Sequence, residues 1–286
     1  MRVIPFEIPK NSPEAFRVQH DQVKHLYNYL HQHPEIQLTL IKESHGTLVA
    51  GEYVGPFHPG DVFIIGGNQP HVFRNEEQYF RKKSKAETIT VFFDERTLGK
   101  EFWLLPEMKG VYAFLQNSAG GFRVSGHKRK WLSERLEALL TAKQLHRLVL
   151  FMEILTVFQT RRELHPLSKA TISRQIKTYD GNRLNRIMEF TFREYYRTIT
   201  LKEVAALANL TPEAFCKYFK TRTRKTYTLF LNEIRINKAC QLLQEDQPVA
   251  AVCYDCGFTN RSNFNRIFKK IKKTSPARWR KQQLTS

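Results

Sequence analysis

The chain contains the stretch TLKEVAALANLTPEAFCKYFKTR at residues 200–222 and, at an offset of 48 positions, the similar stretch PVAAVCYDCGFTNRSNFNRIFKKIK at residues 248–272. Both stretches have small or apolar residues at matching positions. Each pattern fits two short helices joined by a tight turn. The internal repeat therefore predicts that one bihelical unit occurs twice in the chain.

The helix starts in the first copy carry capping residues. Thr200 with Glu203 is a capping box, and Thr211 followed by Pro212 supplies the next N-cap with a proline at the first helical position. Two helices that start about eleven residues apart have the spacing of a DNA-binding helix-turn-helix. Between the copies, apolar residues at helical spacing predict a connecting helix over Tyr227–Gln244.

A longer pattern of spaced residues runs through the second half of this region. It consists of Ile234-Arg235-Ile236 with Ala239 and Leu242-Leu243, then Val252 to Phe258, then Ser262 to Lys269, and finally Pro276, Trp279 and Arg280. This set resembles the DNA-binding domain of AraC/XylS-type transcription regulators. The resemblance covers roughly the last hundred residues. It implies an all-α domain with two helix-turn-helix units, and promoter DNA and RNA polymerase as partners.

The resemblance also implies which residues face DNA. The groove-facing positions are Glu213, Cys216 and Lys217 in the first unit and Arg261, Ser262, Asn263 and Arg266 in the second, and Lys220 and Lys269 contact phosphates. Arginine pairs with guanine and asparagine with adenine, so the second unit is chemically better equipped for specificity. The chain departs from the family after each groove-facing helix, where Arg224 and Lys273 replace the usual glycine.

Charge is distributed unevenly along the chain. The formal net charge of the 286 residues is +19, and residues 183–286 hold 21 Lys and Arg against 8 Asp and Glu. This asymmetry indicates a polyanionic partner for the C-terminal part. No apolar run approaches the roughly 18 residues that span a bilayer, and the N-terminus has no signal-peptide pattern, so we expect a cytoplasmic protein and no membrane.

The four cysteines do not predict a metal or redox site. Cys253 and Cys256 form a C-x-x-C pair, but they occupy the positions that Ala205 and Ala208 hold in the first copy. We therefore interpret them as small core residues, and no second pair completes a zinc site.

The first half of the chain predicts a small antiparallel β-structure. Short apolar runs alternate with turn residues, and the expected strands are 36–41, 46–54, 61–65, 72–73 and 89–93. Closely spaced strands without intervening helices are typical of a small barrel or sandwich. Residues 30–35, followed by Pro59-Gly60-Asp61-Val62 and Gln69-Pro70-His71, resemble a cupin-type sensor domain, which implies a barrel.

Three histidines mark the expected sensor site. In metal-binding cupins a His-x-His pair, a nearby carboxylate and a later histidine hold an ion, and the corresponding residues here are His31, His33, Gln37 and His71. Gln37 replaces the carboxylate and is a poor ligand for a transition metal. We therefore expect these four residues to bind a small-molecule effector, or to be satisfied core groups, and we expect no metal or other cofactor.

Two amphipathic segments, 131–142 and 145–158, predict a helical pair after the sensor. In the resembling family such a pair commonly forms a dimer interface, and packing on its own barrel is the alternative. The predicted organisation is a sensing and dimerisation domain at 1–161, a linker at 162–182 and a DNA-binding domain at 183–286, with helix-turn-helix units at about 200–222 and 248–272.

The sequence thus predicts a ligand-responsive, sequence-specific transcription regulator, an activator or dual regulator and not an enzyme. Two alternatives remain open at this stage. One is a metal-dependent cupin enzyme with a basic nucleic-acid-binding tail, and the other is a regulator whose barrel serves only for dimerisation.

Overall fold

A computed structural model describes residues 15–76, 78–81, 84–94, 98–168, 178–245 and 247–284. The chain divides into two units, the first ending at Thr178 and the second starting at Tyr179. Within the described residues, none of the helices combines the length and the apolar character needed to traverse a bilayer.

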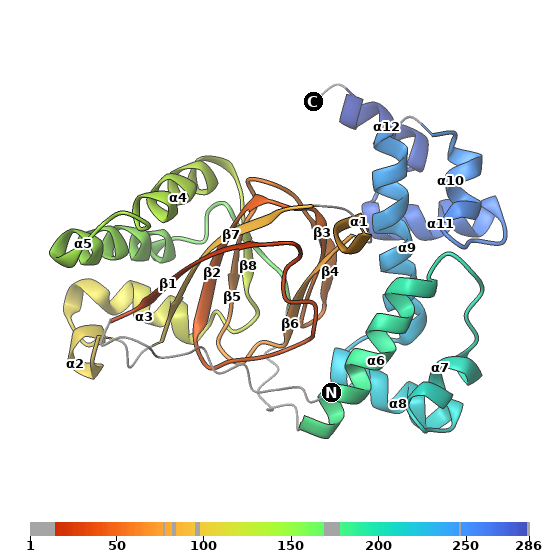
Figure 1. Cartoon of the computed structure of the whole chain (residues 1–286), viewed down its shortest axis with the longest axis horizontal. Helices are drawn as coiled ribbons and strands as arrows, with labels where there is room; N and C mark the ends of the chain where they lie inside the picture. Colours follow the sequence, from red (N-terminus) through yellow and green to blue (C-terminus); the bar gives the residue numbers. More distant parts are fainter. Residues whose placement is uncertain are drawn as a thin grey trace. The chain divides into compact units, whose positions relative to one another are not determined.

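The first unit is built mainly from strands, with short helices between the later ones (Figure 1). Its strands are β1 (Arg17–Val23), β2 (Ile36–Glu43), β3 (Gly46–Ala50), β4 (Tyr53–Phe57), β5 (Val62–Ile65), β6 (His71–Asn75), β7 (Ala86–Phe93), β8 (Phe122–Val124) and β9 (Leu164–Pro166). Its helices are α1 (Gln78–Arg81), α2 (Lys100–Trp103), α3 (Lys109–Gln116), α4 (Gly126–Ala138) and α5 (Gln144–Leu155), with 3-10 turns η1 (Pro106–Met108) and η2 (Thr156–Gln159).

The strands form two antiparallel sheets, and the expected closed barrel is not found among the described residues. The larger sheet has the order β1-β7-β2-β5-β8-β9 and the smaller the order β4-β3-β6. In a closed barrel the edge strands would pair with one another. Here β1 and β9 are the edges of the larger sheet, and β4 and β6 are the edges of the smaller sheet. Strand lengths and turn spacings are similar in barrels and sandwiches, so the sequence pattern alone could not distinguish the two.

The central strands of the larger sheet, β7, β2 and β5, are buried on both faces. Leu38, Val62 and Phe93 point into one core, which also contains Leu136 and Phe151 from the helical pair. On the opposite face, alternate residues of the same strands pack against the smaller sheet in a second core, whose members include Ile41, Phe63, Leu48, Phe57 and Phe73. Period-two alternation therefore sends each strand's side chains into two different cores.

In the described part of the second unit, all regular secondary structure is helical. They are α6 (Thr178–Glu194), α7 (Leu201–Leu207), α8 (Pro212–Thr223), α9 (Tyr227–Gln244), α10 (Val249–Asp255), α11 (Arg261–Lys272) and α12 (Pro276–Leu284). In Figure 1, α9 runs between the group α6–α8 and the group α10–α12. The predicted connecting helix and both helix-turn-helix motifs are thus confirmed. They could be predicted because their capping and apolar patterns are local in the sequence.

Several elements differ from the expectations. The expected strand 46–54 is instead a hairpin, in which β3 and β4 pair antiparallel with Gly46 opposite Phe57 and Ala50 opposite Tyr53. Strand β1 lies in a segment that the sequence left unpatterned, and it pairs with β7 from Arg17 to Val23. The expected linker 162–182 includes β9, which pairs with β8, and it also includes the start of α6. The remainder of that segment, residues 169–177, lies outside the described residues.

Candidate functional site

The first helix-turn-helix is fixed by its predicted caps. The Thr200 hydroxyl accepts a hydrogen bond from the Glu203 amide at 3.2 Å, and the Thr211 hydroxyl accepts one from the Ala214 amide at 3.3 Å. Between the two helices Asn209 adopts a left-handed backbone with φ of 52°. The capped starts and the tight turn together set the direction of α8.

Helix α8 separates an apolar face from a polar one. Phe215 and Phe219 are fully buried. The predicted DNA-facing residues all lie exposed on the same helix, and they are Glu213, Cys216, Lys217 and Lys220. The helix therefore turns polar and charged groups outward while its aromatic groups hold it in the unit.

The second helix-turn-helix repeats this construction. Gly257, which corresponds to Asn209, has a φ of 77°, and a Cβ there would lie 2.4 Å from the Tyr195 carbonyl oxygen, so only glycine fits. Cys253 and Cys256 are buried, free thiols, as the repeat predicted. Burial raises the pKa of Cys256 to about 12, which keeps this thiol protonated and unreactive.

Helix α11 is the more basic of the two outward-facing helices. The Asn260 side chain caps it by accepting a hydrogen bond from the Asn263 amide at 2.8 Å. The Arg266 guanidinium donates to the Asn263 side-chain oxygen at 2.8 Å, so these two predicted base-contacting groups are held together. Arg261, Ser262, Arg266 and Lys269 are exposed, and Asn263 is half-buried.

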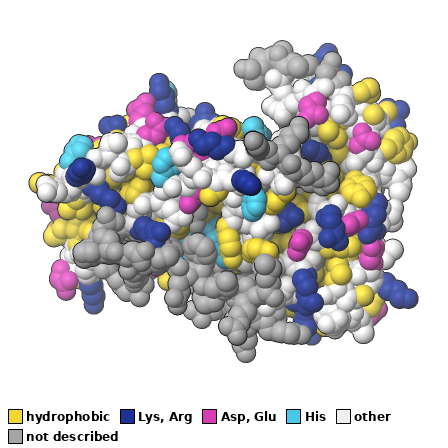
Figure 2. All heavy atoms as spheres, viewed as in Figure 1, with side chains coloured by type: hydrophobic (Ala, Val, Ile, Leu, Met, Phe, Trp, Pro, Cys, Tyr) yellow, Lys and Arg dark blue, Asp and Glu magenta, His cyan; other side chains and the backbone are white. Residues whose placement is uncertain are grey.

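Lysine and arginine side chains lie on the surface of the second unit, with acidic side chains interspersed on the face drawn in Figure 2. Not every basic group of α11 is available to phosphates. The Lys272 ammonium donates to the Asn237 side-chain oxygen at 3.0 Å and is thereby tied to α9. Lys220 and Lys269 are both exposed.

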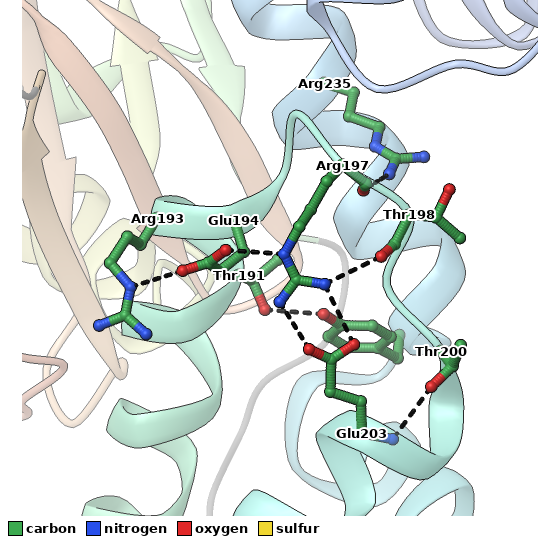
Figure 3. A network of polar contacts seen from close by, with 9 residues as sticks. Thr191, Arg193, Glu194, Arg197, Thr198, Thr200, Glu203 and Arg235 are labelled. Carbon is green, nitrogen blue, oxygen red and sulfur yellow. Dashed lines mark hydrogen bonds and ion pairs between the residues drawn. The ribbon is translucent and has the colours of Figure 1, made fainter.

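A polar network that the sequence did not reveal connects α6, α7 and α9 (Figure 3). The Arg197 guanidinium lies 2.7 Å from the Glu194 carboxylate and 2.5 Å from the Glu203 carboxylate. Arg235, buried in α9, donates to the carbonyl oxygens of Tyr195 at 2.8 Å and Arg197 at 2.6 Å. An arginine between Ile234 and Ile236 was the signal that could have predicted it.

In the first unit, the structure brings the predicted sensor residues together. One ring nitrogen from each of His31, His33 and His71 lies within 4.8 Å of the others. Nε2 of His33 and Nε2 of His71 lie 3.0 and 2.9 Å from Oε1 of Gln37. All four side chains are buried, His71 completely.

The backbone fixes two of these rings. His31 and His71 form a pair of reciprocal backbone hydrogen bonds of 3.0 and 2.9 Å. Nδ1 of His31 donates to the Tyr29 carbonyl at 2.9 Å, and Nδ1 of His71 donates to the Gln69 carbonyl at 2.8 Å. Burial lowers the pKa of His31 to about 4 and lowers that of His71 well below its ordinary value, so both rings are neutral near pH 7.

Two open hollows lie elsewhere on the first unit. One, of about 560 Å³, is lined mainly by apolar side chains of η1, α3 and α5, among them Met108, Leu148 and Met152. The other, of about 370 Å³, is lined by Pro34, Asn68 and Tyr112 together with their neighbours. Neither hollow has His31, His33 or His71 in its lining.

Comparisons with known proteins agree with the helical architecture. The family model described as "Helix-turn-helix domain" matches residues 204–282. The chain is similar to the uncharacterized HTH-type transcriptional regulator YdeC of Bacillus subtilis, with 23% identity over 265 residues that cover 89% of this chain and 87% of YdeC. It is also similar to the HTH-type transcriptional activator RhaS of Klebsiella pneumoniae, with 27% identity over 45% of this chain and 43% of RhaS.

Solved structures with some likeness include ToxT from Vibrio cholerae, at a TM-score of 0.36 and 13% identity, covering 93% of this chain and 97% of that one. Another is a DNA-binding transcriptional dual regulator from Escherichia coli K-12, at a TM-score of 0.34 and 19% identity over 36% of this chain and 94% of that one.

Proposed function

We propose that this chain, which carries an AraC-type helix-turn-helix domain at its C-terminal end, is a sequence-specific transcription regulator whose first unit senses an effector. One observation carries the DNA-binding part. Both α8 and α11 turn polar and basic side chains outward while their phenylalanines are buried, and one helix, α9, joins the two helix-turn-helix motifs within the second unit. This is the arrangement that inserts two helices into the major groove on one face of duplex DNA.

The side chains have different roles at that interface. Arg261, Asn263 and Arg266 contact base edges from α11, and Glu213, Cys216 and Lys217 do so from α8. Ser262 supports the contacts of α11, and Lys220 and Lys269 bind phosphates. The asymmetric charge of the chain supports this assignment, because the excess of basic residues lies in the second unit.

The first unit supplies the control. Effector binding at His31, His33, Gln37 and His71 shifts the population of the DNA-competent state, and the regulator acts on promoter DNA together with RNA polymerase in the cytoplasm. A second copy of the chain pairs with it through α5, where Leu145 and Val149 are exposed apolar side chains. The curated relatives are named as transcription regulators, so we assign no catalytic reaction to the chain.

Comparing three single alanine variants of the full chain tests the DNA-binding assignment. Binding is measured on a duplex selected from random sequence and on a scrambled duplex, over a range of salt. Arg266→Ala should lose about 1–3 kcal/mol of binding free energy on the selected duplex and little on the scrambled duplex. Lys269→Ala should weaken binding to both duplexes equally. It should also reduce the slope of log affinity against log salt concentration by about one.

Arg278→Ala is the matched control, since Arg278 is exposed in the same unit but lies on α12. It should bind as the unchanged chain does. If Arg266→Ala loses the same affinity for both duplexes, or loses none, then α11 does not make the sequence-specific contacts.

A further inference from the structure

Helices α8 and α11 each carry one stripe of exposed side chains. In α8 the stripe follows the spacing i, i+3, i+4 and i+7 and consists of Glu213, Cys216, Lys217 and Lys220. Beyond the turn, the two copies of the repeat are offset by 49 positions, so that Phe215 corresponds to Phe264. The matching stripe of α11 is therefore Ser262, Asn265, Arg266 and Lys269, and all four are exposed.

Asn265 is the member of this stripe that the sequence did not single out. It takes the place that Cys216 has in α8, and the neighbouring Phe264 and Phe268 are fully buried on the opposite side of the helix. Its exposed amide makes no hydrogen bond within the part of the chain that the structure describes. Both the oxygen and the nitrogen of this amide are therefore available to a base.

Asn263 lies beside the stripe and not in it. It corresponds to Ala214 of α8, and it is half-buried. Its side-chain oxygen accepts a hydrogen bond from Nη2 of Arg266 at 2.8 Å. A guanidinium can only donate, so the amide atom that faces it must be the oxygen, because the opposite orientation would bring two donors together.

The two asparagines therefore differ in what they can offer to a base pair. Asparagine recognises adenine with both amide atoms, the oxygen accepting from N6 and the nitrogen donating to N7. In Asn263 the oxygen is already bound to Arg266, whereas in Asn265 both atoms are unoccupied. The hydrogen bond also restricts the Arg266 side chain before DNA is bound and leaves its other N–H groups for O6 and N7 of guanine.

We propose that Asn265 is the residue of α11 that reads adenine, and that Asn263 is a positioning residue that holds Arg266 for a guanine. This assignment rests on the proposed function and specifies its base contacts. Asn263 keeps its place at the interface, but it acts there through Arg266. The half-site bound by α11 then contains one adenine and one guanine, which are read by two consecutive residues of the stripe.

Two alanine variants of the full chain separate these roles. Each protein selects duplexes from random sequence, and its affinity is measured for the selected duplex and for single base-pair changes of it. Asn265→Ala should lose an adenine preference that is about tenfold in the unchanged chain, and it should keep the guanine preference. Asn263→Ala should keep the adenine preference and weaken the guanine preference by about threefold.

Combined substitutions show whether Asn263 acts through Arg266. The guanine position is the one whose preference disappears in Arg266→Ala. In that background Asn263→Ala should remove no further preference, whereas the losses of Asn265→Ala and Arg266→Ala should largely add. Asn263→Asp keeps an acceptor, so the guanine preference should survive, although the added negative charge should weaken binding to every duplex. A residue that only supports the fold would not separate preference from affinity in this way.

The alanine variants leave the helix start intact. The Asn260 side chain caps α11 through the backbone amide of residue 263, which alanine retains, and alanine already stands at the corresponding position 214 of α8. Circular dichroism checks the folding of each variant. Arg278→Ala, exposed on α12, is the control and should select the same sequence as the unchanged chain.

An adenine preference that persists in Asn265→Ala, or that is lost in Asn263→Ala, would overturn the assignment of the adenine contact. A guanine preference that Asn263→Ala leaves unchanged would overturn the positioning role. If the unchanged chain selects no common sequence at all, the proposed function itself is contradicted.

Discussion

Arg224 and Lys273 follow α8 and α11 and adopt a left-handed backbone, with φ of 61° and 62°. Glycine is the usual residue at these positions in the family that the sequence resembles, and side chains with a Cβ pay a conformational penalty there. Both residues are exposed. The helix ends thus keep the geometry of a glycine cap without the glycine.

Replacing Arg224 by glycine should stabilise the second unit. The gain in the free energy of unfolding should be about 0.5–1 kcal/mol, because relief of the left-handed strain exceeds the extra chain entropy of glycine. Urea denaturation measures it. Arg224→Ala removes the same charge and keeps the strain, so it should show no gain. Equal stability of the two variants would contradict this explanation.

Local signals allowed prediction of single residues only where the partner is near in sequence. The caps at Thr200 and Thr211 were predicted because each binds an amide three residues away. The His31–His71 pair could be proposed as members of one site, but the carbonyls that orient the rings and the amide oxygen of Gln37 come from the tertiary fold.

At the level of elements, Arg235 connects helix α9 to the end of α6. Its guanidinium donates to two backbone carbonyls of the segment that follows α6 and lies 5.5 Å from the Phe258 ring, so it contacts both helix-turn-helix halves of the unit. The network in Figure 3 thereby fixes the direction in which α7 leaves α6.

Arg235→Met should lower the free energy of unfolding by about 2–4 kcal/mol, because two carbonyls lose their donors in a buried place. Arg235→Lys should recover part of this loss, since an ammonium cannot reproduce the planar fork of the guanidinium. The exposed Arg186→Met on α6 serves as the comparison and should stay within about 0.5 kcal/mol. A loss in Arg186→Met as large as that in Arg235→Met would disprove the role of the buried contacts.

Glu233 makes the second unit sensitive to pH. Burial raises the pKa of this carboxyl above its ordinary value of 4.5, although the Lys225 ammonium at 2.5 Å opposes the shift. A raised pKa means that the folded state holds the proton more tightly than the unfolded chain. The resulting stabilisation is complete below pH 4.5 and is lost as the pH rises through the raised pKa.

The stability of the unchanged chain, relative to Glu233→Gln, should therefore decrease as the pH rises above about 4.5. Urea denaturation at several pH values gives the difference. Glu245→Gln, at an exposed position near the end of α9, should show no such trend. A constant difference for Glu233→Gln across this range would show that its pKa is not shifted by folding.

The strands could be predicted less completely than the helices. Apolar alternation located β2, β5 and β7, but β9 contains only Leu164–Pro166 and is defined by its pairing with β8. A three-residue strand has no periodicity that a sequence can show. Closure of the sheet likewise depends on which edges pair, and this information is not present in any single segment.

For the whole molecule, composition predicted which unit binds DNA better than it predicted the site in the first unit. The excess positive charge predicts that the second unit binds a polyanion. The first unit carries the buried histidine cluster, whose chemistry became definable only when the ring orientations were known.

The most direct test of the central claim is to map, across a genome, the DNA bound by the intact chain and by the Arg261→Ala/Arg266→Ala double variant. We expect the unchanged chain to bind discrete sites that share one sequence pattern, and we expect the double variant to lose those sites. Diffuse, salt-sensitive binding that is the same in both would contradict it, because the second unit would then hold DNA by charge alone.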